Sequence, residues 1–143
     1  MLLDIPLIYQ RTAHDCGSAT FKIIEGFWGG RGRPPKADPL HGLSPDALEP
    51  AFRAAGYNVL AGELTTGALR SLTSQGWPVA CLIRTDEDAG HWVVVRGVRY
   101  GRVHYVDPSA GLQSRTIAEW DVRWHDADRR GTVFRRYGLA VHC

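Results

Sequence analysis

The chain has 143 residues, a hydrophobic fraction of 44% and a formal net charge of +2 at pH 7. This length fits one domain with its own core, so we expect residues 1–143 to form a single domain. The small charge, without long runs of one sign, argues against a nucleic-acid partner. No signal peptide opens the chain, and no apolar stretch approaches the roughly 20 residues of a membrane span. We therefore expect a cytoplasmic protein without a membrane span.

Helices are predicted mainly in the first half of the chain. Helical spacing of apolar residues and flanking turn residues predict three of them, over 15–28, 44–56 and 66–74. Asp15 is expected to cap the first helix, and Pro50 to kink or split the second. Gly29 to Pro39 is rich in Gly, Arg and Pro and predicts a surface loop. A short strand is predicted over 57–60.

Strands dominate the second half. Apolar and β-branched runs predict them over 78–84, 91–98, 103–107, 112–117 and 132–141. A turn over 99–102 is expected to join the second and third of these strands as a hairpin. Trp120 and Trp124 are expected to serve packing. Helices first and strands later predict an α+β fold, with N-terminal helices packed on a C-terminal antiparallel sheet.

Cys16 carries the strongest functional signal. It lies in Gln10-Arg11-Thr12-Ala13-His14-Asp15-Cys16-Gly17-Ser18-Ala19, at the predicted start of the first helix, where unpaired N–H groups favour an anion. A thiol attacks as the thiolate, so this position suits a nucleophile. The other two cysteines, Cys81 and Cys143, are a core residue and a terminal thiol by their settings. An odd, scattered set of three is no disulfide framework and indicates a reducing compartment.

His91 is the best partner for this thiol. It starts the apolar run Gly90-His91-Trp92-Val93-Val94-Val95, which predicts a rigid strand. Asp107 ends the neighbouring hairpin strand, so we expect it to lie beside His91 and to hold the imidazole ring. Such a histidine lowers the pKa of a nearby thiol and later protonates a leaving group.

A tetrahedral intermediate also needs donors for its oxyanion. The backbone N–H of Cys16 supplies one, and the side-chain amide of Gln10 is expected to supply the other. Small residues let a substrate approach closely, so we expect Gly17 and Gly90, together with Trp92, to bind the substrate.

The order of these stretches resembles the bacteriocin-processing cysteine peptidases, which cleave after double-glycine leaders and have a papain-like fold. The matching parts cover nearly the whole chain and include Gln10 to Ala19, Leu48 to Tyr57, Trp77 to Ile83, Gly90 to Val95 and Val106 to Gly111. The resemblance implies a thiol protease with a peptide or protein substrate and no cofactor or metal. It assigns the nucleophile, general base, orienting acid and oxyanion donor to Cys16, His91, Asp107 and Gln10, respectively. The family's best-known members are N-terminal domains of peptide-exporting transporters, and we expect no transporter segment in this chain. The loop from Gly29 to Pro39 is also unusual for the family.

Alternative functions stay open at this point. The same nucleophile serves glutamine deamidases and acyltransferases of the toxin or effector type. A catalytically silent peptide-binding module is another alternative, although the intact Cys16, His91 and Asp107 count against it. A zinc site built from His14, Cys16, His142 and Cys143 is disfavoured, because these residues lack the usual ligand spacing. The sequence does not define the oligomeric state.

Overall fold

The computed structural model describes residues 2–12, 15–30, 43–85, 90–127 and 131–143. The predicted loop from Gly29 to Pro39 lies mostly outside these ranges. The helices within them are α1 (Cys16–Trp28), α2 (Pro45–Ala54), α3 (Thr66–Ser74) and α4 (Ile117–Arg123). The strands are β1 (Asn58–Glu63), β2 (Val79–Arg84), β3 (Gly90–Arg99), β4 (Arg102–Asp107), β5 (Gly111–Thr116), β6 (His125–Ala127), β7 (Val133–Arg135) and β8 (Tyr137–His142). None of the helices in the described ranges has the length and hydrophobicity that crossing a bilayer requires.

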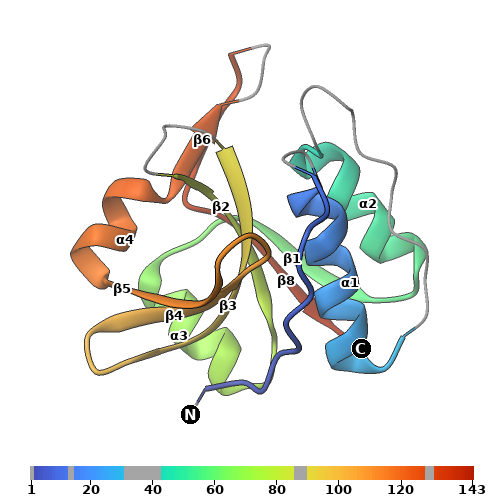
Figure 1. The fold of residues 1–143 in the computed structure, drawn as a ribbon, viewed down its shortest axis with the longest axis horizontal. Coiled ribbons are helices and arrows are strands. Elements are labelled where there is room, and N and C mark those ends of the chain that lie inside the picture. Colours follow the sequence, from blue (N-terminus) through green and yellow to red (C-terminus); the bar gives the residue numbers. More distant parts are fainter. Residues whose placement is uncertain (1, 13–14, 31–42, 86–89, 128–130) are drawn as a thin grey trace.

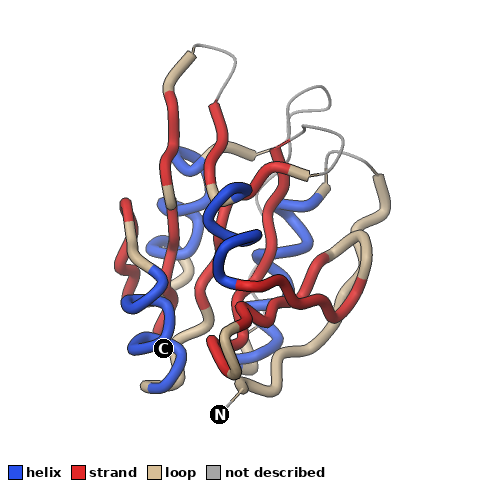
Figure 2. Tube along the Cα trace, turned by 90° about the vertical axis from the view of Figure 1, so that its left-hand side faces the viewer, coloured by secondary structure: helices blue, strands red, loops and turns tan. Residues whose placement is uncertain are grey.

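One antiparallel sheet organises the molecule (Figures 1 and 2). Its six strands follow the order β1-β8-β2-β3-β4-β5, while β6 and β7 pair with each other as a separate hairpin. The predicted hairpin of β3 and β4 is confirmed. Its turn places Tyr100 and Gly101 at φ angles of 55° and 72°, and positive values at both central residues fit the right-handed twist of the strands.

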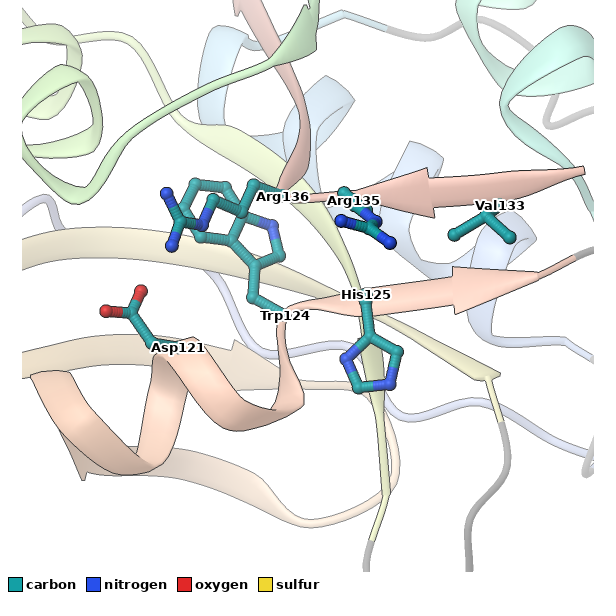
Figure 3. Close-up of a pocket in the computed structure, with 6 residues that line it drawn as sticks. All are labelled: Asp121, Trp124, His125, Val133, Arg135 and Arg136. Atoms are coloured by element: carbon teal, nitrogen blue, oxygen red, sulfur yellow. The ribbon is translucent and has the colours of Figure 1, made fainter.

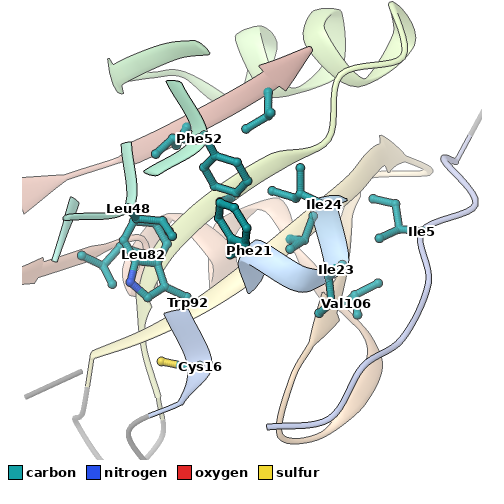
Figure 4. Packing of buried hydrophobic residues seen from close by; sticks show 14 of the residues in the cluster. Ile5, Cys16, Phe21, Ile23, Ile24, Leu48, Phe52, Leu82, Trp92 and Val106 are labelled. Atoms are coloured by element: carbon teal, nitrogen blue, oxygen red, sulfur yellow. The ribbon is translucent and has the colours of Figure 1, made fainter. Parts of the chain in front are cut away.

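Helices cover both faces of this sheet. On one face α1 and α2 pack over Trp92 and Val94 of β3, and Figure 4 shows Trp92 within this core. On the other face α3 and α4 pack over Val93 and Val95. Successive side chains of a strand point to opposite faces, so β3 contributes to two cores at once. Burial on both faces explains why its sequence is an unbroken apolar run and not an alternating one. The sheet therefore holds the start of β3 in a rigid position.

Two predicted details of the helices are only partly right. The second helix is not split at Pro50, because α2 runs from Pro45 to Ala54 with Pro50 on its exposed side. Asp15 occupies the N-cap position of α1, but its side chain makes no capping hydrogen bond. The end of α1 is as expected, because Gly29 takes a left-handed conformation with φ of 75°.

The C-terminal part differs most from the prediction. The run predicted as one strand over 132–141 is split at Arg136, whose positive φ of 49° turns the chain from β7 into β8. Helix α4 and strand β6 were not predicted. A capping box formed by Thr116 and Glu119 begins α4, and this pair was the available sequence signal. Trp120 and Trp124 are buried, which confirms their expected role in packing.

Candidate active site

Cys16 is the first residue of α1. Its side chain is 7% exposed and belongs to the same core cluster as Trp92, as Figure 4 shows. The cysteine is free of any disulfide. The first N–H groups of a helix have no carbonyl partner within it and carry part of the positive end of the helix dipole. Cys16 therefore lies at the end of α1 where the unpaired N–H groups of a helix are found.

His91 lies at the start of β3 and Asp107 at the end of β4. The Nε2 atom of His91 is 2.7 Å from Oδ1 of Asp107, the distance of a strong hydrogen bond. The side chain of Cys16 lies close enough to His91 to contribute to the raised pKa of its imidazole. Because Nε2 faces Asp107, the ring nitrogen left for the thiol is Nδ1. The structure thus brings Cys16, His91 and Asp107 together, with His91 and Asp107 joined by a hydrogen bond.

The opposite charges of His91 and Asp107 stabilise each other. Burial alone lowers the pKa of His91, but hydrogen bonds and Coulomb attraction to Asp107 and Cys16 outweigh burial and raise the pKa from 6.5 to about 9. Burial alone raises the pKa of Asp107, but its bonds from His91 and Ser109 lower it below the ordinary 3.8. At neutral pH the histidine is therefore an imidazolium and the aspartate a carboxylate.

This pair predicts a pH-dependent contribution to stability. We expect Asp107→Asn to lower the free energy of unfolding by about 2 kcal/mol where both groups are charged. The raised pKa of His91 gives stabilisation that is complete below pH 6.5 and is lost as the pH rises through about 9. The lowered pKa of Asp107 gives stabilisation that is complete above pH 3.8 and is lost at more acid pH. Urea unfolding of parent and variant at pH 5, 7.5 and 10 measures this difference, and a difference that does not shrink by pH 10 contradicts the expectation.

Gln10 lies beside the turn that follows β4, because its backbone N–H bonds to the carbonyl of Pro108 at 2.9 Å. Its side-chain Nε2 donates to the carbonyl of Thr12 at 2.7 Å, and its Oε1 is buried without a hydrogen-bond partner in the part of the chain that the structure describes. A primary amide carries two N–H groups, so one remains beyond the bond to Thr12. The role of Gln10 as oxyanion donor stays a prediction.

The three residues predicted to bind substrate have packing roles in this structure. Trp92 is 1% exposed, and its Nε1 donates to the carbonyl of Leu43 at 2.8 Å. A Cβ on Gly17 would lie 2.7 Å from the Cβ of Leu43, so Gly17 provides room for this leucine. Their contact with a substrate stays a prediction.

Gly90 provides room for a different neighbour. A Cβ at this position would lie 2.2 Å from Oδ2 of Asp126, which no real side chain tolerates. Oδ1 of Asp126 pairs with Nε of Arg84 at 3.3 Å, and Arg84 is the strand partner of Gly90. The β6–β7 hairpin is therefore attached to the sheet directly beside His91. The sequence did not reveal this contact, because Asp126 lies far along the chain.

Sequence reasoning also missed Ser109. Its Oγ lies 2.8 Å from Oδ1 of Asp107 and 3.4 Å from Nε2 of His91. The available signal was the turn sequence Asp-Pro-Ser, in which an aspartate side chain commonly bonds to the backbone two residues later.

A pocket of about 340 Å³ lies elsewhere, between the end of α4 and the β6–β7 hairpin (Figure 3). The residues that line it are Asp121, Trp124, His125, Val133, Arg135 and Arg136. None of these is a predicted site residue, and all except Trp124 are exposed. The group of Cys16, His91 and Asp107, and not this pocket, therefore defines the candidate active site.

Solved structures with the same fold are peptidase domains. A double-glycine-motif protease from an AMS/PCAT transporter, solved in complex with the leader peptide, is 19% identical with a TM-score of 0.66, covering 98% of this chain and 92% of that chain. The peptidase domain of Streptococcus mutans ComA is 15% identical with a TM-score of 0.67, covering 96% of this chain and 98% of that chain. No curated protein sequence matches the chain.

The class of protein is that of the papain-like cysteine peptidases, which are thiol-dependent hydrolases. The chain belongs to the Peptidase C39 family, whose model matches residues 4–127. Family and fold confirm the resemblance and the α+β architecture expected from the sequence.

Proposed function

We propose that the protein hydrolyses a peptide bond with Cys16 as nucleophile, His91 as general base and acid, and Asp107 as the group that orients His91. The observation that carries this proposal is the hydrogen bond between His91 and Asp107, with Cys16 at the start of α1 close enough to act on the His91 imidazole. The raised pKa of His91, about 9, supports it, because the imidazolium that must protonate a leaving group is then present at neutral pH.

The proposed reaction has two stages. The Cys16 thiolate attacks the peptide carbonyl, and the carbonyl oxygen becomes an oxyanion. When the carbon–nitrogen bond breaks, the Nδ1 proton of His91 passes to the departing amine, and a thioester remains on Cys16. His91 then takes a proton from water, the hydroxide attacks the thioester, and the thiolate departs from the released acid. His91 finally holds the proton taken from water, so the starting ion pair is restored.

Two donors are proposed for the oxyanion. The backbone N–H of Cys16 stands at the helix start, where no helical carbonyl accepts it. The second donor is the Nε2 amide of Gln10, through the hydrogen that is not bonded to Thr12. A donor of this kind contributes on the order of 3 kcal/mol to transition-state stabilisation.

The proposed substrate is a peptide with two glycines before the cleaved bond. The similarity to the double-glycine-motif protease, which was solved with the leader peptide, supports this choice. The low exposure of Cys16, 7%, gives a physical reason for it. A carbonyl must come within bonding distance of a buried sulfur, and residues without side chains let the substrate backbone approach closely.

Cysteine alkylation against pH tests the proposed ion pair. We expect iodoacetamide to modify Cys16 faster than Cys143 below neutral pH, because the imidazolium of His91 stabilises the thiolate. Peptide mass spectrometry resolves each cysteine. Cys143 is exposed and serves as the ordinary thiol, while burial raises the pKa of the Cys81 thiol and keeps it unreactive.

The matched variant is His91→Ala. It should remove the reactivity of Cys16 in the acid range and leave that of Cys143 unchanged. If Cys16 and Cys143 respond to pH in the same way in the parent protein, the ion pair does not exist and the proposed mechanism is wrong.

A further inference from the structure

Three short distances join polar atoms of Ser109 to the side chains of Asp107 and His91. Its backbone N–H and its hydroxyl both lie 2.8 Å from Oδ1 of Asp107. The same carboxylate oxygen lies 2.7 Å from Nε2 of His91. The hydroxyl oxygen of Ser109 is itself 3.4 Å from this nitrogen. Three donors therefore converge on one oxygen of Asp107.

The hydroxyl adds something that the backbone does not supply. The bond from the Ser109 N–H already closes the turn after β4, as in other Asx turns. A carboxylate held by one backbone bond still rotates about its Cβ–Cγ bond, since this terminal torsion is broad. A second donor from another direction, on the same oxygen, restricts this rotation. The oxygen that accepts the hydrogen bond from His91 is thereby held in place.

We propose that Ser109 is a positioning residue, whose hydroxyl fixes the Asp107 carboxylate in the orientation that holds the His91 ring. The consequence for catalysis rests on the proposed function, but the geometry itself does not. The serine acts through Asp107 and is not assigned a contact with substrate.

The titration of Asp107 reports this role. Its backbone and side-chain bonds from Ser109 both lower the pKa of the carboxyl group, in addition to the larger effects of burial and of His91. Among the described residues, the titratable groups around Asp107 are His91, which forms a hydrogen bond with it, Cys16, which acts on the pKa of His91, and Tyr9, whose hydroxyl lies beside Gly111. Loss of the Ser109 hydroxyl should therefore raise the pKa of Asp107.

NMR titration of the full chain tests the proposal. The Asp107 carboxyl carbon and the His91 ring nitrogens are followed in the parent and in Ser109→Ala, Ser109→Thr and Ser114→Ala. Ser114, on strand β5, is the matched control. Its hydroxyl also takes part in a side-chain hydrogen bond, which it accepts from Arg102 at 3.0 Å. We expect Ser109→Ala to raise the pKa of Asp107 and to speed exchange of the His91 Nε2 proton with water by about tenfold.

Ser109→Thr keeps a hydroxyl and should behave as the parent, as should Ser114→Ala. An unchanged Asp107 titration with unchanged proton exchange in Ser109→Ala overturns the proposal. A threonine variant that behaves like the alanine variant also overturns it, because the hydroxyl is then not the cause.

Alkylation of Cys16 in the same proteins separates this proposal from the proposed function. In Ser109→Ala we expect Cys16 to react about tenfold more slowly below neutral pH. If the parent Cys16 shows no reactivity that depends on His91, the proposed function fails, and the NMR comparison still decides the role of Ser109.

Discussion

Replacing Cys16 by alanine should lower the rate of peptide cleavage by at least about 10³-fold, because removal of the nucleophile removes the covalent pathway altogether. The side chain is small, so the variant should keep the fold, which circular dichroism checks. Cleavage is measured by mass spectrometry on peptides with two glycines before a candidate bond.

The control for this experiment is Cys143→Ala, which removes an exposed thiol outside the site and should leave the rate unchanged. The masses of the products also distinguish the alternative reactions. Two fragments indicate hydrolysis of the chain, whereas a gain of about one dalton in an intact target indicates deamidation of glutamine. A Cys16→Ala protein that cleaves as fast as the parent would exclude Cys16 as nucleophile.

The second large effect is expected on stability. Trp92→Ala should lower the free energy of unfolding by about 3–5 kcal/mol, the usual cost of truncating a buried aromatic side chain. The indole is 1% exposed, donates to the Leu43 carbonyl and lies 6.0 Å from the ring of Tyr137 in an edge-to-face arrangement. Chemical denaturation of parent and variant measures the loss.

Trp92→Phe is the graded control, because it keeps most of the apolar volume and removes the hydrogen bond to Leu43. It should lose about 1–2 kcal/mol. If instead both variants unfold like the parent and only KM for a peptide rises, Trp92 serves substrate binding and its packing role is minor. The two measurements thus decide between the predicted role and the one that its burial indicates.

The sequence was sufficient to predict that Cys16, His91 and Asp107 lie together, and their catalytic roles stay predictions. A thiol at a helix start, a histidine at the start of an apolar strand and an aspartate at the end of the next strand are all local patterns. Strand pairing then brings His91 and Asp107 together, because a hairpin fixes which residues are neighbours. Cys16 joins them because α1 packs against β3 and places its first residue near the start of that strand.

The features that were missed depend on contacts across the chain or on side-chain orientation. Asp126 occupies the space that a side chain at position 90 would need, and no local sequence pattern indicates a contact between residues so far apart. The amide of Gln10 bonds to Thr12, an orientation set by the surrounding backbone. The three-residue strand β6 is stabilised by its partner β7, and its length is too short for any periodicity to indicate it.

The residues of the candidate site are separated by very different lengths of chain. His91 and Asp107 are 16 residues apart, whereas His91 and Cys16 are separated by 91 − 16 = 75 residues. Closing the longer loop costs about 1.4 kcal/mol more in chain entropy than closing the shorter one. The histidine–aspartate pair therefore forms with its own hairpin, while the thiol reaches the imidazole only when α1 docks on the sheet. A nascent or partly unfolded chain then has the proposed base without the proposed nucleophile, so we expect hydrolytic activity only in the fully folded molecule.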